Sequence, residues 1–143
     1  MKLRIAWIGK TKEPAIQSLT AEYLKRLSHY ADAQGMALKD ESALLKLCGS
    51  ARQTLVLLDS GGKQLSSEEF AEYLRNHQDR NPLPLLFAVG PANGFSAETR
   101  QEAKLLLSLG KMTVARELAR VVLLEQLYRA LTILKGHPYH LGH

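Results

Sequence analysis

The pattern of apolar and polar positions along the chain predicts alternating strands and helices. Three short apolar segments bounded by turn residues, at 3–9, 54–59 and 83–90, are typical of strands buried on both faces of a sheet. Two weaker candidate strands lie at 111–114 and near 36–38. Helical patterns occur between these segments. Together they predict an α/β fold with a mostly parallel sheet and helices on both of its faces.

The helices have physical start signals. An apolar stripe at helical spacing covers residues 16–30. Ser66 and Glu69 form a capping-box pattern, which satisfies two free backbone N–H groups at the start of a helix. Ser96 is a suitable cap for a further helix that we expect to run to about Leu107.

The last helix, 116–136, is apolar almost all the way round and ends at Gly136, a residue suited to a helix C-terminus. One side carries Leu118, Val122 and Ile133, and another carries Leu124, Leu127, Leu131 and Leu134. A helix that is apolar on all sides must be buried on all sides. At the end of a small domain, the simplest second partner is another copy of the chain. We therefore predict a homodimer through the helix at 116–135.

Two charged pairs interrupt this apolar helix. Glu125 and Arg129 are spaced i, i+4 in the favourable order, so we expect them to pair or to face a site. The alternative is a simple ion pair that locks an interface. Arg116 and Arg120 share another face, where two stacked cations would suit a bound anion. The alternative for them is ordinary solvation.

Composition and charge add few constraints. The 143 residues are predicted to form one domain, 1–143, and hydrophobic residues make up 45% of them. The net charge of +5 favours a polyanionic partner such as nucleic acid, although many basic proteins bind no polyanion. The single cysteine, Cys48, suits a reducing compartment and lies in an apolar stretch typical of an inert thiol. No window is long enough for a membrane span or a signal-peptide core, so we expect a cytoplasmic protein.

Glycine-rich loops follow two of the predicted strands, at 59–62 and 90–94. In open α/β sheets, ligands bind beyond the carboxyl ends of the strands. Neither loop matches a phosphate-binding motif, so a nucleotide-like ligand held by backbone contacts fits better. The alternative is that these glycines only make turns.

The C-terminal tail carries His137, His140 and His143, with Pro138 and Tyr139 between the first two histidines. Three histidines on a terminal strip, with no cysteine nearby, form a poor metal cage, and we expect no metal site. Pro138 favours an extended conformation, and the tyrosine ring favours packing or stacking. Disorder is the alternative for 141–143.

Three quoted segments carry a resemblance to a known family. They are "LLDSGGKQLSSEEFAEYL" (57–74), "LLFAVGPANGFS" (85–96) and "LGKMTVARELARVVLLEQLYRALTILKGHPYH" (109–140). Together they resemble the ribosomal large subunit methyltransferase H family, a single-domain branch of the SPOUT methyltransferases. This chain reads GPANG where the family has a GPEG-like loop, and TVAR where the family usually reads TxPH.

The resemblance implies a SPOUT-type fold with a C-terminal trefoil knot, a homodimer, and S-adenosylmethionine as methyl donor. The implied substrate is a pseudouridine of large-subunit (23S) rRNA, methylated at N3. The implied donor-binding positions are Leu58, Gly90, Gly110, Lys111, Met112, Thr113, Val114 and Ala115. The family's tail contributes to the active site, and these positions correspond here to Tyr139 and His140.

Methyl transfer to an imide nitrogen requires loss of its proton and stabilisation of the developing anion. We expect Arg129, Tyr139 and His140 to surround the base, with His140 as a candidate proton acceptor and Glu125 orienting Arg129. Arg116 and Arg120 are expected to bind rRNA phosphates. The alternative function is a non-catalytic dimer that binds the ribosome or RNA and has lost donor binding.

Overall fold

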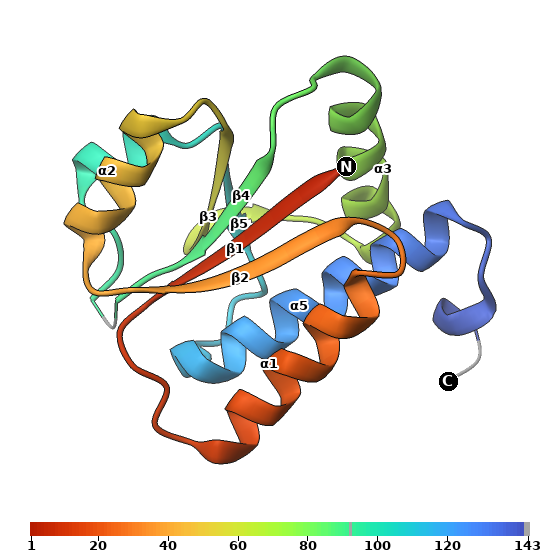
Figure 1. The fold of residues 1–143 in the computed structure, drawn as a ribbon, viewed down its shortest axis with the longest axis horizontal. Coiled ribbons are helices and arrows are strands. Elements are labelled where there is room, and N and C mark those ends of the chain that lie inside the picture. Colours follow the sequence, from red (N-terminus) through yellow and green to blue (C-terminus); the bar gives the residue numbers. More distant parts are fainter. Residues whose placement is uncertain (92, 142–143) are drawn as a thin grey trace.

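The computed structural model describes residues 1–91 and 93–141, and it contains one parallel sheet with strand order β2-β1-β4-β3-β5 (Figure 1). The strands are β1 (Lys2–Ile8), β2 (Asp32–Leu38), β3 (Thr54–Gln64), β4 (Leu85–Val89) and β5 (Leu105–Ser108). The helices are α1 (Pro14–Leu27), α2 (Glu41–Ser50), α3 (Ser67–Arg80), α4 (Ala97–Glu102) and α5 (Arg116–Leu134), followed by the short 3₁₀ helix η1 (Pro138–His140).

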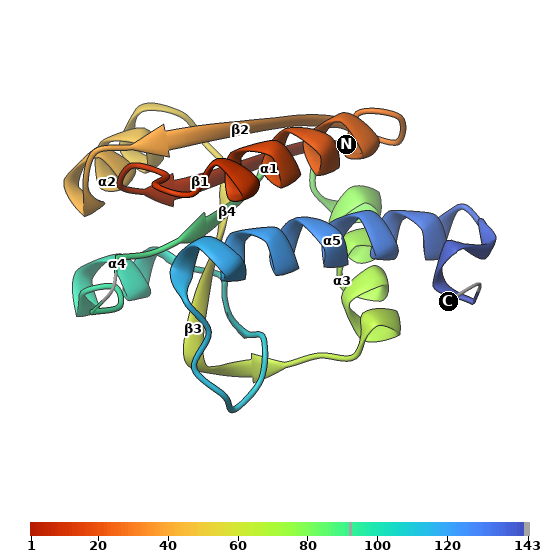
Figure 2. The ribbon, with the colours of Figure 1, turned by 90° about the horizontal axis from the view of Figure 1, so that it is seen from below.

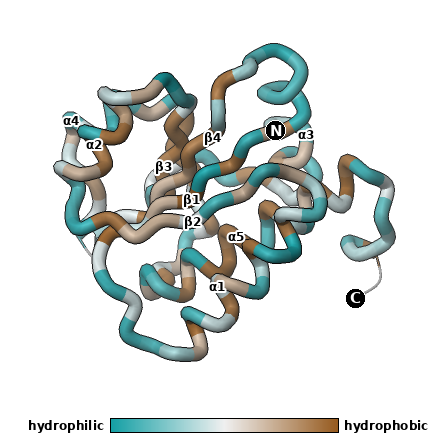
Figure 3. Tube along the Cα trace, viewed as in Figure 1, coloured by the Kyte–Doolittle hydropathy of each residue, from teal (hydrophilic) through white to brown (hydrophobic). Residues whose placement is uncertain are grey.

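Helices cover both faces of the sheet, as predicted. Strand β4 shows why, because its five residues are all buried and alternate between two core clusters. Phe87 packs with residues of α1, α3 and α5, whereas Leu86 packs with Leu44 of α2 on the opposite face. Figure 3 shows the apolar strands at the centre and polar segments around them.

The predicted strands at 3–9, 54–59 and 83–90 are confirmed as β1, β3 and β4, and the weaker candidate near 36–38 belongs to β2. The candidate strand at 111–114 is wrong, because those residues form an irregular loop. The fifth strand is instead β5, in a segment that we expected to end the helix capped by Ser96. That helix stops at Glu102, because Ala103 turns to an extended conformation and the following leucines pair with β3.

Strand β3 has a large irregularity near the carboxyl end of the sheet. Leu58 and Lys63 both pair with Leu107 of β5, so residues 59–62 form an excursion from the strand. Gly62 permits this return, because a Cβ atom there would lie 2.5 Å from the Leu106 carbonyl oxygen. The excursion therefore stays attached to the sheet at both of its ends.

Past α5 the chain does not stay extended as predicted. His137 is extended, but Pro138 starts the single turn of η1, in which the backbone N–H of Leu141 donates to the Pro138 carbonyl. The turn places the tail against the end of α5 (Figure 2). Ala92 and His143 lie outside the described residues.

Candidate functional site

A cleft of about 470 Å³ lies beyond the carboxyl ends of β3 and β4. Its walls come from the β3 excursion, the glycine loop after β4, the loop before α5 and the first turn of α5. This is the edge of a parallel sheet where ligands of α/β proteins bind.

Six of the eight predicted donor-binding residues line this cleft: Leu58, Gly90, Gly110, Met112, Thr113 and Val114. The other two, Lys111 and Ala115, lie in the same loop but are not among the residues that line the cleft. Gly90 allows the Phe95 ring to pack closely against the cleft wall, because a Cβ atom there would lie 2.6 Å from that ring. Gly110 adopts a φ of 143°, a conformation that side chains rarely allow.

The charged side chains along the described lining are Asp59, Arg100 and Arg116. Arg100 lies 3.6 Å from Asp59, and the backbone N–H of Gly61 donates to the same carboxylate at 3.0 Å. Leu58, Val89, Phe95, Leu107 and Val114 supply apolar surface. The cleft thus combines an apolar body with a few polar groups, as small-molecule sites generally do.

Arg120 departs from its predicted place on an RNA-binding face. Its side chain is only 3% exposed, and its guanidinium lies 4.2 Å from the centre of the Trp7 ring. Nη2 donates to Thr11 at 2.8 Å and Nη1 donates to Thr20 at 3.3 Å. The predicted direct contact between Arg120 and RNA phosphates is therefore wrong for this structure, because burial removes the guanidinium from the surface. Arg116 is half-buried and lines the cleft.

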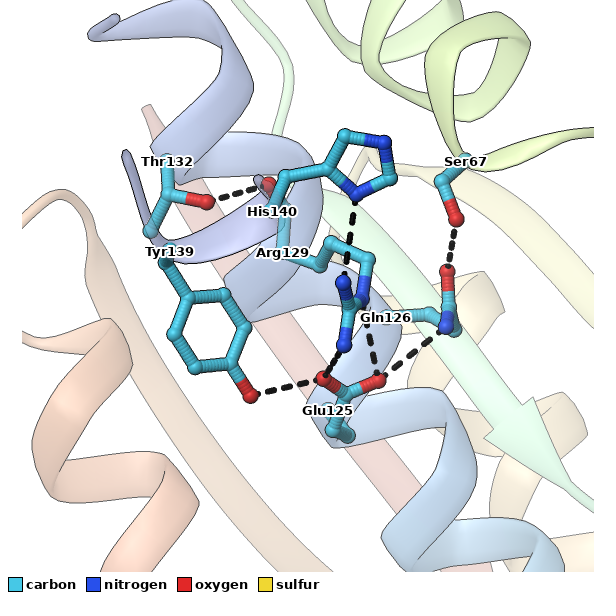
Figure 4. Close-up of polar contacts among 7 residues, drawn as sticks. All are labelled: Ser67, Glu125, Gln126, Arg129, Thr132, Tyr139 and His140. Carbon is cyan, nitrogen blue, oxygen red and sulfur yellow. Dashed lines mark hydrogen bonds and ion pairs between the residues drawn. The ribbon is translucent and has the colours of Figure 1, made fainter. Parts of the chain in front are cut away.

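A second polar site lies at the opposite end of α5 (Figure 4). The predicted Glu125–Arg129 pair is confirmed: Arg129 Nη2 donates to Glu125 Oε2 at 2.8 Å, and Nε lies 3.5 Å from Oε1. The Tyr139 hydroxyl donates to Glu125 Oε2 at 2.8 Å. Gln126 donates to Glu125 Oε1 and in turn accepts from Ser67 of α3. We call Glu68, Glu125, Arg129, Tyr139 and His140 the tail cluster.

The contacts of His140 indicate its tautomer. Arg129 Nη1 lies 3.1 Å from His140 Nδ1, and a guanidinium can only donate. Nδ1 therefore accepts, and the neutral ring carries its proton on Nε2, which donates to Glu68 Oε2 at 3.2 Å. The backbone N–H of Glu68 and this contact with His140 hold the pKa of the Glu68 carboxyl below its usual value.

Tyr139 and Arg129 are both kept in their protonated forms. Burial, and then the hydrogen bond to Glu125, raise the pKa of Tyr139 well above its usual range. The hydrogen bond with Glu125 likewise raises the pKa of Arg129. Tyr139 is thus a hydrogen-bond donor in this site and not a base.

The cleft and the tail cluster lie far apart in one chain. Arg116 and Arg129 are 13 positions apart in α5, which corresponds to about 20 Å at the rise of an α-helix. Reacting atoms must approach to about 3–3.5 Å. A donor in the cleft and a base at the tail cluster of the same chain could therefore not react.

Comparisons with known proteins bear on the whole chain. A family model described as a predicted SPOUT methyltransferase matches residues 1–140. A ribosomal RNA large subunit methyltransferase H from Koribacter versatilis is 58% identical, with all of both chains covered. One from Gloeobacter violaceus is 41% identical, covering 99% of this chain and 100% of that relative.

The chain belongs to the ribosomal RNA large subunit methyltransferase H family of SPOUT methyltransferases.

Two solved structures share the fold of this family member at low sequence identity. The candidate methyltransferase Lpg2936 from Legionella pneumophila, solved with SAM, aligns with a TM-score of 0.54 and 15% identity. The SpoU methyltransferase AviRb from Streptomyces viridochromogenes, solved with AdoMet, aligns with a TM-score of 0.58 and 13% identity. This chain is covered to 91% and 95%, and it spans 66% and 59% of those chains.

The family resemblance did not point to Arg100 or Glu68. Arg100 lies in α4, whose cap at Ser96 was predicted, but its distance from Asp59 depends on the β3 excursion. Glu68 lies in the predicted capping-box segment, and only the turn of the tail brings His140 to it.

Within the described ranges, no group of three or more His, Cys, Asp or Glu side chains is placed to hold a metal ion. In the same part of the chain, no helix is long and apolar enough to cross a membrane. Burial raises the pKa of the Cys48 thiol, which agrees with an unreactive cysteine.

Proposed function

We propose that this protein transfers a methyl group from S-adenosylmethionine to large-subunit rRNA, at N3 of a pseudouridine. The observation that carries the proposal is the cleft, in which six implied donor positions meet at the carboxyl edge of the sheet. The full-length relatives named as rRNA methyltransferases support the same activity. When bound, the donor supplies an electrophilic methyl group on its sulfonium.

The residues of the cleft fit such a donor. The volume of about 470 Å³ lies within the usual range for small-molecule sites, about 300–1,000 Å³. Gly110 has open space beside its backbone, which leaves that backbone within reach of a ligand, as a site that recognises a nucleoside without a phosphate cradle requires.

Arg129 stabilises the negative charge that develops on the imide as its proton leaves. Glu125 and the ring of Tyr139, 5.0 Å from the guanidinium, hold Arg129 in place before the reaction. A charged donor that is held near the base in this way stabilises the developing anion and so lowers the barrier.

His140 accepts the imide proton at Nδ1, with Glu68 holding the Nε2 proton as the orienting carboxylate. In the described arrangement Nδ1 contacts Arg129. The reaction therefore requires the guanidinium to move from Nδ1 to the carbonyl oxygens of the base. Tyr139 stays protonated and positions Glu125.

The active site requires two copies of the chain, because the cleft and the tail cluster are separated by about 20 Å along α5. The apolar side of α5 with Leu118 and Val122 is exposed, to 53% and 40%. Antiparallel packing of two α5 helices about Val122 would bring Arg116 of one copy opposite Arg129 of the other. A homodimer through α5 would thus cover this surface and complete two sites.

The ribosomal substrate is held through its phosphates. Arg116, at the edge of the cleft, keeps its predicted role there, whereas Arg120 acts from inside by holding α5 to β1 and α1. The family resemblance further implies one domain over 1–143, a C-terminal trefoil knot and a cytoplasmic location beside the ribosome.

Calorimetry and a methylation assay test this function. We expect S-adenosylmethionine and S-adenosylhomocysteine to bind at one site per chain, and labelled methyl groups to enter large-subunit rRNA when ribosomes are added. Binding of ribosomes without donor binding would instead support the non-catalytic RNA-binding dimer.

A further inference from the structure

We propose that Asp59 and Arg100 form the subsite for the amino-acid end of the donor, with Arg100 binding the α-carboxylate and Asp59 the α-ammonium. The inference rests on the proposed function, because it assumes that the cleft holds an S-adenosyl donor. It assigns recognition of the amino-acid end of the donor to two residues that the family resemblance does not identify as donor-binding.

The charges of the cleft are unevenly placed. Asp59 is the single acidic side chain along the described lining, and Arg100 lies 3.6 Å from it. The third charged group, Arg116, lies against Gly9, with Nη1 3.4 Å from the position that a Cβ atom would occupy there. Arg116 thus belongs to the β1 side of the cleft. One region of the cleft therefore carries both an anion and a cation.

The backbone holds Asp59 in place. It begins the excursion of β3, and the N–H of Gly61 donates to Oδ2, the same oxygen that faces Arg100. The Asp59 side chain is only 14% exposed, whereas that of Arg100 is 45% exposed. The carboxylate is thus a stationary group, and the guanidinium can adjust to a ligand.

The pair matches an α-amino acid in both charge and spacing. The ammonium and carboxylate of an amino acid sit on one carbon atom, so two opposite charges side by side can bind both at once. At 3.6 Å the Asp59–Arg100 contact is longer than a good charge-assisted hydrogen bond, about 2.7–2.9 Å. A loose, partly exposed ion pair of this kind opens at little cost. The largely apolar remainder of the cleft, with Arg116 on its β1 side, is left for the nucleoside.

Asp59 has one competing role, since carboxylates also bind the hydroxyl groups of a ribose. Ligands that keep the ribose but lack part or all of the amino-acid end distinguish binding of the ammonium from binding of the ribose. 5′-Methylthioadenosine lacks the whole amino-acid end, and decarboxylated S-adenosylmethionine lacks only the carboxylate.

The test is calorimetry of the full-length protein with S-adenosylhomocysteine, S-adenosylmethionine, its decarboxylated form and 5′-methylthioadenosine. The wild-type chain should bind decarboxylated S-adenosylmethionine at least about tenfold more weakly than S-adenosylmethionine, as expected for loss of a charge-assisted contact. This measurement needs no variant, so a folding defect cannot affect it.

Two variants assign the contacts. Arg100→Gln should weaken S-adenosylhomocysteine about tenfold and leave 5′-methylthioadenosine within about twofold. Asp59→Asn should weaken all three ligands that carry the ammonium, including decarboxylated S-adenosylmethionine, and again spare 5′-methylthioadenosine. Arg75→Gln, which removes the exposed Arg75–Glu72 pair of α3, is the matched control and should change nothing.

Three outcomes overturn the inference. Equal weakening of S-adenosylhomocysteine and 5′-methylthioadenosine by Asp59→Asn would assign Asp59 to the ribose. Unchanged binding of S-adenosylhomocysteine by Arg100→Gln would remove Arg100 from the subsite. A wild-type chain that binds none of the four ligands would overturn the proposed function as well. Only that outcome does so.

Discussion

The two ends of α5 are built in opposite ways. The N-terminal end borders an open cleft made mostly of loop backbone and apolar side chains, with Met112 84% exposed beside it. The C-terminal end carries a closed network in which Glu125, Arg129, Tyr139 and His140 already contact one another. The first end has room for a ligand and few charges, and the second has reactive charges and little room. On the proposed function, donor binding and proton chemistry are separated in one chain and would be joined by the proposed homodimer.

The largest effect should come from breaking the proposed α5–α5 interface, which would bring the cleft of one copy to the tail cluster of the other. Val122→Glu places a charge on the exposed apolar side of α5, where a second copy would have to bury it. We expect a monomer by light scattering and no detectable methyl transfer, with S-adenosylhomocysteine binding retained. Glu22→Gln, on the exposed face of α1, serves as control. A dimer with full activity would show that α5 is not the interface.

Mixing two inactive variants tests whether the site is shared. Arg129→Ala should lower kcat at least about a hundredfold, because it removes a preorganised donor, and leave donor binding intact. Gly90→Val should block the cleft through Phe95. Random dimers of the two variants should recover about a quarter of wild-type activity, since half are mixed and each has one intact site. No recovery after refolding together would place the whole site in one chain.

Substitutions of the two arginines in the first turns of α5 should affect different properties, one the stability of the fold and the other RNA binding. Arg120→Ala removes a buried guanidinium from between Trp7, Thr11 and Thr20. It should lower the free energy of unfolding by about 2–4 kcal/mol in urea titrations. Arg116→Ala should leave stability within about 0.5 kcal/mol and reduce the salt dependence of ribosome binding by about one unit. The reverse pattern would restore Arg120 to the RNA surface.

Glu68 should have a smaller effect, because it acts through His140. Glu68→Gln replaces a carboxylate that can only accept with an amide that can also donate to Nε2, so the ring can adopt the other tautomer. We expect kcat to fall about tenfold, within the range for a lost general-base contribution, while donor affinity stays unchanged. Nitrogen NMR of His140 should show protonated Nε2 in the wild type. Glu72→Gln, one turn further along α3 in an exposed pair, is the control.

The smallest effect concerns the titration of Tyr139. Its pKa is raised by burial and by Glu125, so the hydroxyl should stay protonated at a pH where an ordinary tyrosine, with a pKa of about 10, is already ionised. The folded state favours the neutral form of Tyr139, and this preference contributes to the free energy of unfolding. The contribution is fully present below the pKa of an unfolded tyrosine, near 10. It is lost as the pH rises toward the higher pKa of the folded state. Ultraviolet titrations of wild type and Tyr139→Phe should therefore coincide from pH 8 to 11, and one missing tyrosine in that range would contradict this.

The strands of the sheet were predictable from sequence where a short apolar segment, bounded by turn residues, fits only a buried strand. The segment at 83–90 is apolar, short and bounded by turns, and it became β4. The three leucines of β5 were predicted to end a helix, because so short an apolar run fits the periodicity of a helix and of a strand equally well. Pairing with β3, across 40 residues of chain or more, decides between them.

The site was predictable from local motifs and not from distant contacts. The Glu125–Arg129 pair follows from helical spacing alone, and it was found. Burial of Arg120 depends on Trp7 and Thr20, which lie about a hundred positions away in sequence. No local pattern could distinguish Arg120 from Arg116, although only one of them is buried.

The double attachment of the β3 excursion affects how ligands enter and leave. Residues 59–62 are flanked by Leu58 and Lys63, which both pair with β5, and Gly62 lies against the backbone of β5. The facing loop at 109–115 has no such pairing, and most of its side chains are exposed. One wall of the cleft is therefore anchored to the sheet, and we expect the other wall to move more easily. We expect the product to leave past the loop at 109–115. Opening of this loop, and not methyl transfer, should therefore be the rate-limiting step.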